Sequence, residues 1–136
     1  MRKQVGTRIL SLMLAISLFV IFSVTAFAVQ ARYIYDINAS NSLSISGGKA
    51  TMYSDMDGDS SITKVVITHV LQKKSGSSFT NVAGTSKSQT FYKSSPFKED
   101  TVSCTGSGTY RVKTVYSVTG PEGTESHTIY SNSVSY

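Results

Sequence analysis

The chain has 136 residues, a formal net charge of +5 and a single cysteine. This length suffices for one domain with a modest core, and a lone cysteine excludes an internal disulfide framework. Nucleic-acid binding is disfavoured, because three of the thirteen basic residues lie in a predicted leader and the remaining ten face eight acids, a net charge of +2 without a dense basic patch.

The first segment has the three parts of a secretory signal peptide. Residues 1–8 are basic and lack acids, residues 9–24 are almost wholly apolar, and Ala26-Phe27-Ala28 is a small-x-small cleavage site. We therefore predict a signal-peptide helix that is cleaved after Ala28 and meets the membrane only before cleavage. The alternative is an uncleaved anchor, because the apolar run approaches the length that spans a bilayer.

The rest of the chain, residues 29–136, alternates apolar and polar side chains with the period of β-strands. Residues 29–39 predict a first strand or an ordered arm. Residues 42–46 and 50–53 predict two short strands on either side of a turn at Gly47-Gly48, since glycine accepts the positive φ of a tight turn. They form a hairpin or neighbouring strands of a sandwich. Residues 55–61 are a loop by composition.

The middle of the chain predicts several further strands. Residues 62–74 have apolar side chains on both faces, which favours a central strand. Residues 79–83 open the next strand, and residues 89–93 form a short edge strand on which Lys93 discourages further pairing. After the interruption at Pro96, residues 97–104 resume the β pattern.

The most regular strand is expected at residues 108–118. Residues on its mainly apolar and aromatic face alternate with mostly polar residues on the other face. The residues on the apolar face are Tyr110, Val112, Thr114, Tyr116 and Val118. A half-buried strand of this length needs a second layer over its apolar face. A β-turn at Gly120-Pro-Glu-Gly123 and a last strand over residues 125–136 complete the pattern. We therefore predict that residues 29–136 form one all-β, antiparallel β-sandwich of about seven strands.

Three stretches carry a resemblance to known proteins: ITKVVITHVLQKKSG at residues 62–76, Phe79-Thr-Asn-Val82, and SGTYRVKTVY at residues 107–116. The chain resembles a group of small secreted proteins of Gram-positive bacteria, a domain of unknown function. The order of elements is also similar to immunoglobulin and fibronectin type III sandwiches, in which a tyrosine at the start of the sixth strand bonds backbone at a corner. The resemblance implies an immunoglobulin-like sandwich with Tyr110 in that structural role. His69 departs from it, because an apolar residue is expected there.

Asp55, Asp57 and Asp59 place three carboxylates on a glycine-containing segment. Calcium prefers several oxygen ligands at such spacing, so these residues are the candidate ligands of a calcium site, the only cofactor that the sequence suggests. The pattern departs from an EF-hand, because glycine precedes Asp59 and the twelfth residue is Val66. The alternative is a solvated acidic turn.

Other reactive side chains do not form a recognisable catalytic set. His69 and His127 alone cannot complete a zinc site, and a satisfied or rim histidine is the simpler interpretation. Cys104 alternates with Val102, which favours a small buried residue over a nucleophile paired with histidine. No Gly-x-Ser-x-Gly elbow occurs. We therefore expect no catalytic residues and no enzymatic activity.

These observations favour a secreted, non-enzymatic β-sandwich that acts as an extracellular or cell-envelope binding or structural module. The residues alone name no partner. A cell-envelope glycan or protein is the candidate, because exposed tyrosines can bind sugars or proteins. Most tyrosines, however, fall on apolar strand faces as core or rim residues, and the lack of tryptophan weakens a carbohydrate interpretation. No nucleic acid is expected. The alternative is a small secreted effector, bacteriocin-like or toxin-like.

Overall fold

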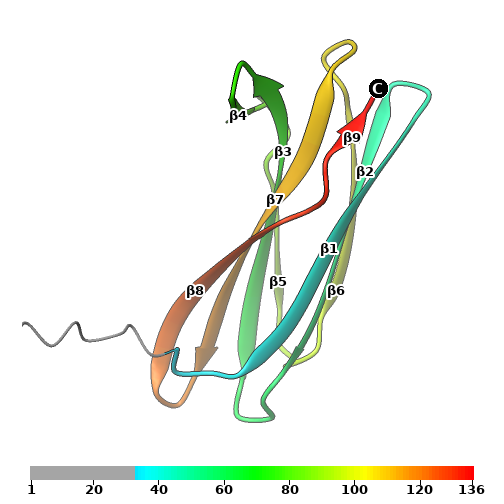
Figure 1. Ribbon diagram of the computed structural model, residues 1–136. Helices are drawn as coiled ribbons and strands as arrows, with labels where there is room; N and C mark the ends of the chain where they lie inside the picture. The colour runs from blue at the N-terminus through cyan, green and yellow to red at the C-terminus, as the bar shows by residue number, and fades with distance from the viewer. Residues whose placement is uncertain (1–32) are drawn as a thin grey trace, which may run out of the picture. The chain divides into compact units, whose positions relative to one another are not determined.

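Residues 33–136, the part of the chain that this computed structural model describes, form two antiparallel β-sheets (Figure 1). One sheet has the order β1-β2-β6, with bounds Ile37–Ser46, Lys49–Gly58 and Phe97–Ser103. The other has the order β4-β3-β7-β8, with bounds Ser78–Asn81, Lys64–Ser75, Thr109–Gly120 and Gly123–Tyr130. In addition, β5 (Lys87–Phe91) pairs with β3, and β9 (Val134–Ser135) pairs with β7. The predicted signal peptide lies outside the described residues.

This architecture confirms the predicted all-β, antiparallel sandwich. The β1-β2-β6 sheet has the order of strands A, B and E of an immunoglobulin-like domain, and β3-β7-β8 has the order of strands C, F and G. Among the described residues there are nine strands, two more than expected. β3 pairs with β4 near its end and with β5 over Val65–His69, the two short strands that were predicted over residues 79–83 and 89–93.

The core lies between the two sheets and is filled from alternate positions of the long strands. Every second residue of β7 from Tyr110 to Val118 is buried, as is the matching set of β3. The first sheet contributes Met52 and Met56 from β2. At about 25 cal/mol per Å² of apolar surface, such side chains supply most of the free energy that holds the sheets together.

The predicted hairpin at Gly47-Gly48 is confirmed. Ser46 pairs with Lys49, and the two glycines have φ values of 57° and 74°, as a two-residue turn between twisted strands requires. The expected loop over residues 55–61 is wrong in its bounds, because β2 continues to Gly58 opposite Ile37. Asp55 and Asp57 therefore lie on a strand.

The expected last strand over residues 125–136 is divided into β8 and β9. Ser131 causes the division, because its hydroxyl accepts from the Val112 N–H at 2.9 Å while its own N–H donates to the Val112 carbonyl at 3.0 Å. A side chain thereby replaces one carbonyl of the strand ladder. In residues 33–136 we find no helix with the length and apolar character needed to cross a membrane.

Candidate functional site

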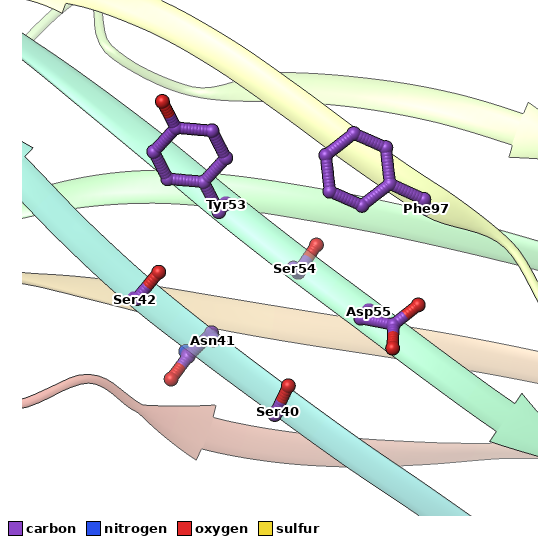
Figure 2. A pocket seen from close by; sticks show the side chains of 7 residues that line it. All are labelled: Ser40, Asn41, Ser42, Tyr53, Ser54, Asp55 and Phe97. Atoms are coloured by element: carbon purple, nitrogen blue, oxygen red, sulfur yellow. The ribbon is translucent and has the colours of Figure 1, made fainter.

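A shallow hollow of about 320 Å³ lies on the outer face of the β1-β2-β6 sheet (Figure 2). Tyr53 on β2 and Phe97 on β6 place aromatic rings beside it. Asp55 lies directly across the strand pair from Phe97. Ser40 and Ser42 line the β1 side, opposite Asp55 and Tyr53. The hollow thus combines two ring surfaces with hydroxyl and carboxylate oxygens.

The strand period explains why these side chains face outward. Met52, Ser54 and Met56 of β2 are buried, so Tyr53 and Asp55 between them project from the opposite face. Phe97 is 53% exposed, although it is a large apolar residue. Packing against the core does not account for this exposed aromatic residue.

The outer face around the hollow is acidic. Glu99 lies across from Tyr53, and Asp57 follows Asp55 on the same face of β2. Lys49, at the far end of β2, is the only basic residue at an outward position of β1, β2 or β6 as the structure describes them. This face therefore favours ligands that donate hydrogen bonds or carry positive charge, and it disfavours anions.

The three candidate calcium ligands lie near one another in sequence but engage other groups. The Asp57 carboxylate accepts from Ser95 Oγ at 2.7 Å. Asp59 accepts from the Ser61 N–H at 2.7 Å, and this hydrogen bond lowers the pKa of the Asp59 carboxyl. Within residues 33–136 no three histidine, cysteine or acidic side chains gather in a way that could hold an ion. Asp55 instead lines the hollow.

A buried polar cluster lies between the sheets, behind the hollow. His69 of β3 is fully buried, and its Nε2 lies 2.6 Å from Ser54 Oγ of β2. Its Nδ1 lies 2.7 Å from Asp100 Oδ2 of β6. Lys98 of β6, also buried, forms an ion pair with the same carboxylate. The cluster links β3 of one sheet to two strands of the other.

The protonation states in this cluster follow from burial. Burial, and then the Lys98 ammonium, lower the pKa of His69 to about 4, so the ring is neutral at pH 7. A neutral ring beside a carboxylate carries its proton on Nδ1, and Nε2 then accepts from the Ser54 hydroxyl. Burial, and then Lys87, lower the pKa of Lys98 to about 8, so most Lys98 side chains remain charged at pH 7.

Ser54, His69 and Asp100 have the hydrogen-bond order of a nucleophile, a base and an orienting carboxylate. Acyl transfer also needs a nucleophile that substrate can reach, and Ser54 is only 1% exposed. The arrangement therefore joins the sheets in this conformation and does not present a reactive hydroxyl. Of the two interpretations of His69, a satisfied or a rim histidine, the structure shows the satisfied one, and its partners were not predicted. Their signal was the inward position of Lys98 and Asp100, in phase with Val102.

Tyr110 makes the corner contact that the immunoglobulin resemblance implies. Its hydroxyl donates to the Gly106 carbonyl four residues upstream at 2.6 Å, and its ring is fully buried. This bond fixes the connection between β6 and β7.

We expect Tyr110→Phe to lower the free energy of unfolding by about 1 kcal/mol, because the ring packing survives and one hydrogen bond is lost. Urea unfolding followed by circular dichroism measures the change. Tyr92→Phe is the matched control, since the Tyr92 side chain is 82% exposed and should be neutral. Equal stability of the two variants would show that the corner bond contributes nothing.

His127 and Cys104 lie outside the buried cluster around His69. His127 Nε2 lies 2.9 Å from Glu125 Oε1, and the Tyr33 ring stacks on the imidazole with 4.3 Å between ring centroids. Glu125 also accepts from the backbone N–H groups of Ile34 and Tyr35, which fastens residues 33–35 to β8 as an ordered arm. Cys104 is half-buried, and burial raises the pKa of its thiol, which disfavours a nucleophilic thiolate.

No protein-family profile matches the chain, and no curated protein matches it. Among solved structures, the chain is similar to a crystal structure from Bordetella pertussis described as the ApaA protein. The two are 10% identical in sequence, and the match covers 74% of this chain and 91% of the other with a TM-score of 0.42.

Proposed function

We propose that this chain is an exported, non-enzymatic binding module of the extracellular space or cell envelope, and that it binds a sugar-like ligand in the hollow over β1, β2 and β6. The observation that carries the proposal is the pair of rings, Tyr53 and Phe97, beside the hydroxyl and carboxylate oxygens of Ser42 and Asp55. Aromatic faces pack against the C–H surface of a sugar, while oxygen atoms accept from its hydroxyl groups.

The acidic residues around the hollow restrict the charge of the ligand. Asp55, Asp57 and Glu99 would repel an anionic sugar, so the ligand is neutral or carries an amine. The hollow is shallow and lies on the outer face of a sheet, which suits a chain of sugars lying along that face better than an enclosed small molecule. A modest affinity is expected, since few groups are removed from water.

The binding test uses a tetramer of N-acetylglucosamine and its deacetylated, amine-bearing counterpart as probes. We expect Tyr53→Ala and Phe97→Ala each to weaken binding about fivefold, because each removes one stacking surface worth about 1 kcal/mol. Titration calorimetry of the purified protein measures the affinities. Tyr92→Ala removes an exposed ring outside the hollow and should leave binding unchanged.

Failure of both probes to bind, or equal losses in all three variants, would contradict a sugar-binding hollow. Export is tested separately by fractionating producing cells. Retention in the envelope or release of a form shortened by 28 residues supports the proposal, and a full-length intracellular chain opposes it. Released protein that inhibits neighbouring strains would favour the effector alternative.

A further inference from the structure

The outer face of the second sheet has the opposite charge from the face with the hollow. The charged residues at outward positions of its strands are all basic: Lys64, Lys74, Arg111 and Lys113. Within residues 33–136 none of the outward positions of β3, β4, β5, β7 and β8 holds an acid. The two faces of the sandwich thus differ in sign, although the net charge of the mature chain is small.

Arg111 on this face is held in a fixed orientation. Its guanidinium carbon lies 4.1 Å from the ring centroid of Phe79 and 4.1 Å from that of Tyr130. Its Nε donates to Gln72 Oε1 at 2.8 Å, and Gln72 in turn donates to Asn81 Oδ1. Stacking and this hydrogen bond fix the plane of the group before any ligand arrives. No salt bridge within the described part of the chain involves Arg111.

Two lysines accompany the stacked arginine. Lys74 pairs across the strands with Phe79, and Lys113 pairs with Tyr130, so each ring that covers Arg111 has a lysine opposite it. Directly paired side chains have Cβ atoms about 5 Å apart. The rigid guanidinium is therefore flanked on both sides by flexible ammonium groups, which is an arrangement suited to an oxyanion.

From this arrangement we infer that the outer face of the β3-β7-β8 sheet binds a phosphate-bearing anionic polymer, with Arg111 as the central contact and Lys74 and Lys113 beside it. A guanidinium recognises a phosphate with two parallel hydrogen bonds. Lys113 pairs across the strands with Val70, and Lys64 lies six residues from Val70 along β3. The two lysines are therefore about 20 Å apart along the sheet, which favours a polymer over a single phosphate. Only an extended ligand can meet both ends of the face.

This site is independent of the proposed sugar site. The acidic residues Asp55, Asp57 and Glu99 face away from it on the other sheet, so the polymer would bind one face only. A module bound in this way to an anionic surface would present its hollow outward. Either site can exist without the other, and separate variants test them.

The test titrates the purified protein with inorganic polyphosphate, and with orthophosphate at the same phosphate concentration. We expect saturable binding of polyphosphate that weakens with salt. Arg111→Gln and Arg111→Lys should each weaken it about tenfold, since lysine keeps the charge but loses the planar fork. Lys113→Gln should weaken it several-fold and lower the salt slope by about one. Lys49→Gln, a basic residue on the acidic face, is the matched control and should change nothing.

Three results would overturn the inference: unchanged binding in both Arg111 variants, equal occupancy by orthophosphate, or tighter binding of single-stranded DNA with the same number of phosphates. Lys113→Gln keeps the test decisive if Arg111→Gln does not fold, because Lys113 lies outside the ring stack. Tyr53→Ala should leave polyphosphate binding intact, which separates failure of this site from failure of the hollow.

Discussion

Asp100→Ala should lower the free energy of unfolding by about 3 kcal/mol, the largest effect that we expect from removing one charged side chain. The substitution leaves Lys98 buried without its carboxylate and His69 Nδ1 without its acceptor. Breaking a buried ion pair costs about 3–5 kcal/mol, and we expect the lower end because 19% of the Asp100 side chain remains exposed. Urea unfolding at pH 7 measures the loss, which approaches the whole stability of many small domains.

The neighbouring acid provides the control for this prediction. Glu99 lies on the outer face of the same strand, so Glu99→Ala should change stability by less than about 0.5 kcal/mol. A second variant tests the mechanism. Replacing Ser54, His69, Lys98 and Asp100 together by apolar residues should restore much of the stability, because buried ionic groups gain little over well-packed apolar ones. If Asp100→Ala instead matches the wild type, the buried pair does not exist in solution.

Acid should destabilise the wild-type protein before its exposed carboxyl groups titrate. The pKa of His69 is about 4 in the folded protein and about 6.5 in the unfolded chain. Between these two pH values the His69 imidazole is protonated in the unfolded chain but not in the folded protein. The free energy of unfolding therefore falls as the pH is lowered from about 6.5 to 4, and it rises as the pH is raised again. The difference of about 2.5 pH units corresponds to about 3 kcal/mol at most. The charged groups around His69 are Asp100, Lys98 and, across the strand pair, Lys87.

His69→Gln isolates this contribution, because glutamine does not titrate. The free energy of unfolding of the variant should depend less on pH between 4 and 6.5 than that of the wild type. The comparison uses the slopes of the two curves, so a uniform loss of stability in the variant does not affect it. Parallel curves would mean that His69 is accessible to protons in the folded protein. Glu125, whose pKa is lowered by backbone N–H groups, contributes equally to both curves.

The presence of most strands, and the face of the sheet to which many side chains point, were predictable because both follow the two-residue period of a strand. The alternation from Tyr110 to Val118 predicted the buried face of β7. For β3, the apolar residues on both faces left the surroundings of His69 undecided between a satisfied and a rim histidine. Strand ends were less predictable, because they depend on pairing partners. β2 continues through Asp55 and Asp57 since β1 runs opposite to it as far as Ile37, and β8 stops where the Ser131 hydroxyl enters the ladder.

The candidate sites likewise have parts that a local pattern predicts and parts that depend on strand pairing. The acidic residues Asp55, Asp57 and Asp59 were visible as a cluster in the sequence, where they were expected on one loop. In the structure Asp55 and Asp57 lie on β2, and Asp59 follows the end of that strand. The hollow was not visible, because Tyr53 and Phe97 are 44 residues apart in the chain and meet only across a strand pair. Arg111 and the two rings that stack on it come from three different strands, β7, β4 and β8.

The amino-acid order alone determined the fold class, since alternation with period two and glycine turns leave each ribbon with one apolar face that must be covered. Tertiary structure decided which polar groups meet. Ser54, His69 and Asp100 belong to three strands of two sheets, and their contacts depend on strand order and register, which no local pattern specifies. The same holds for the opposite charges of the two faces, because a residue's sheet is set by pairing and not by its neighbours in the chain.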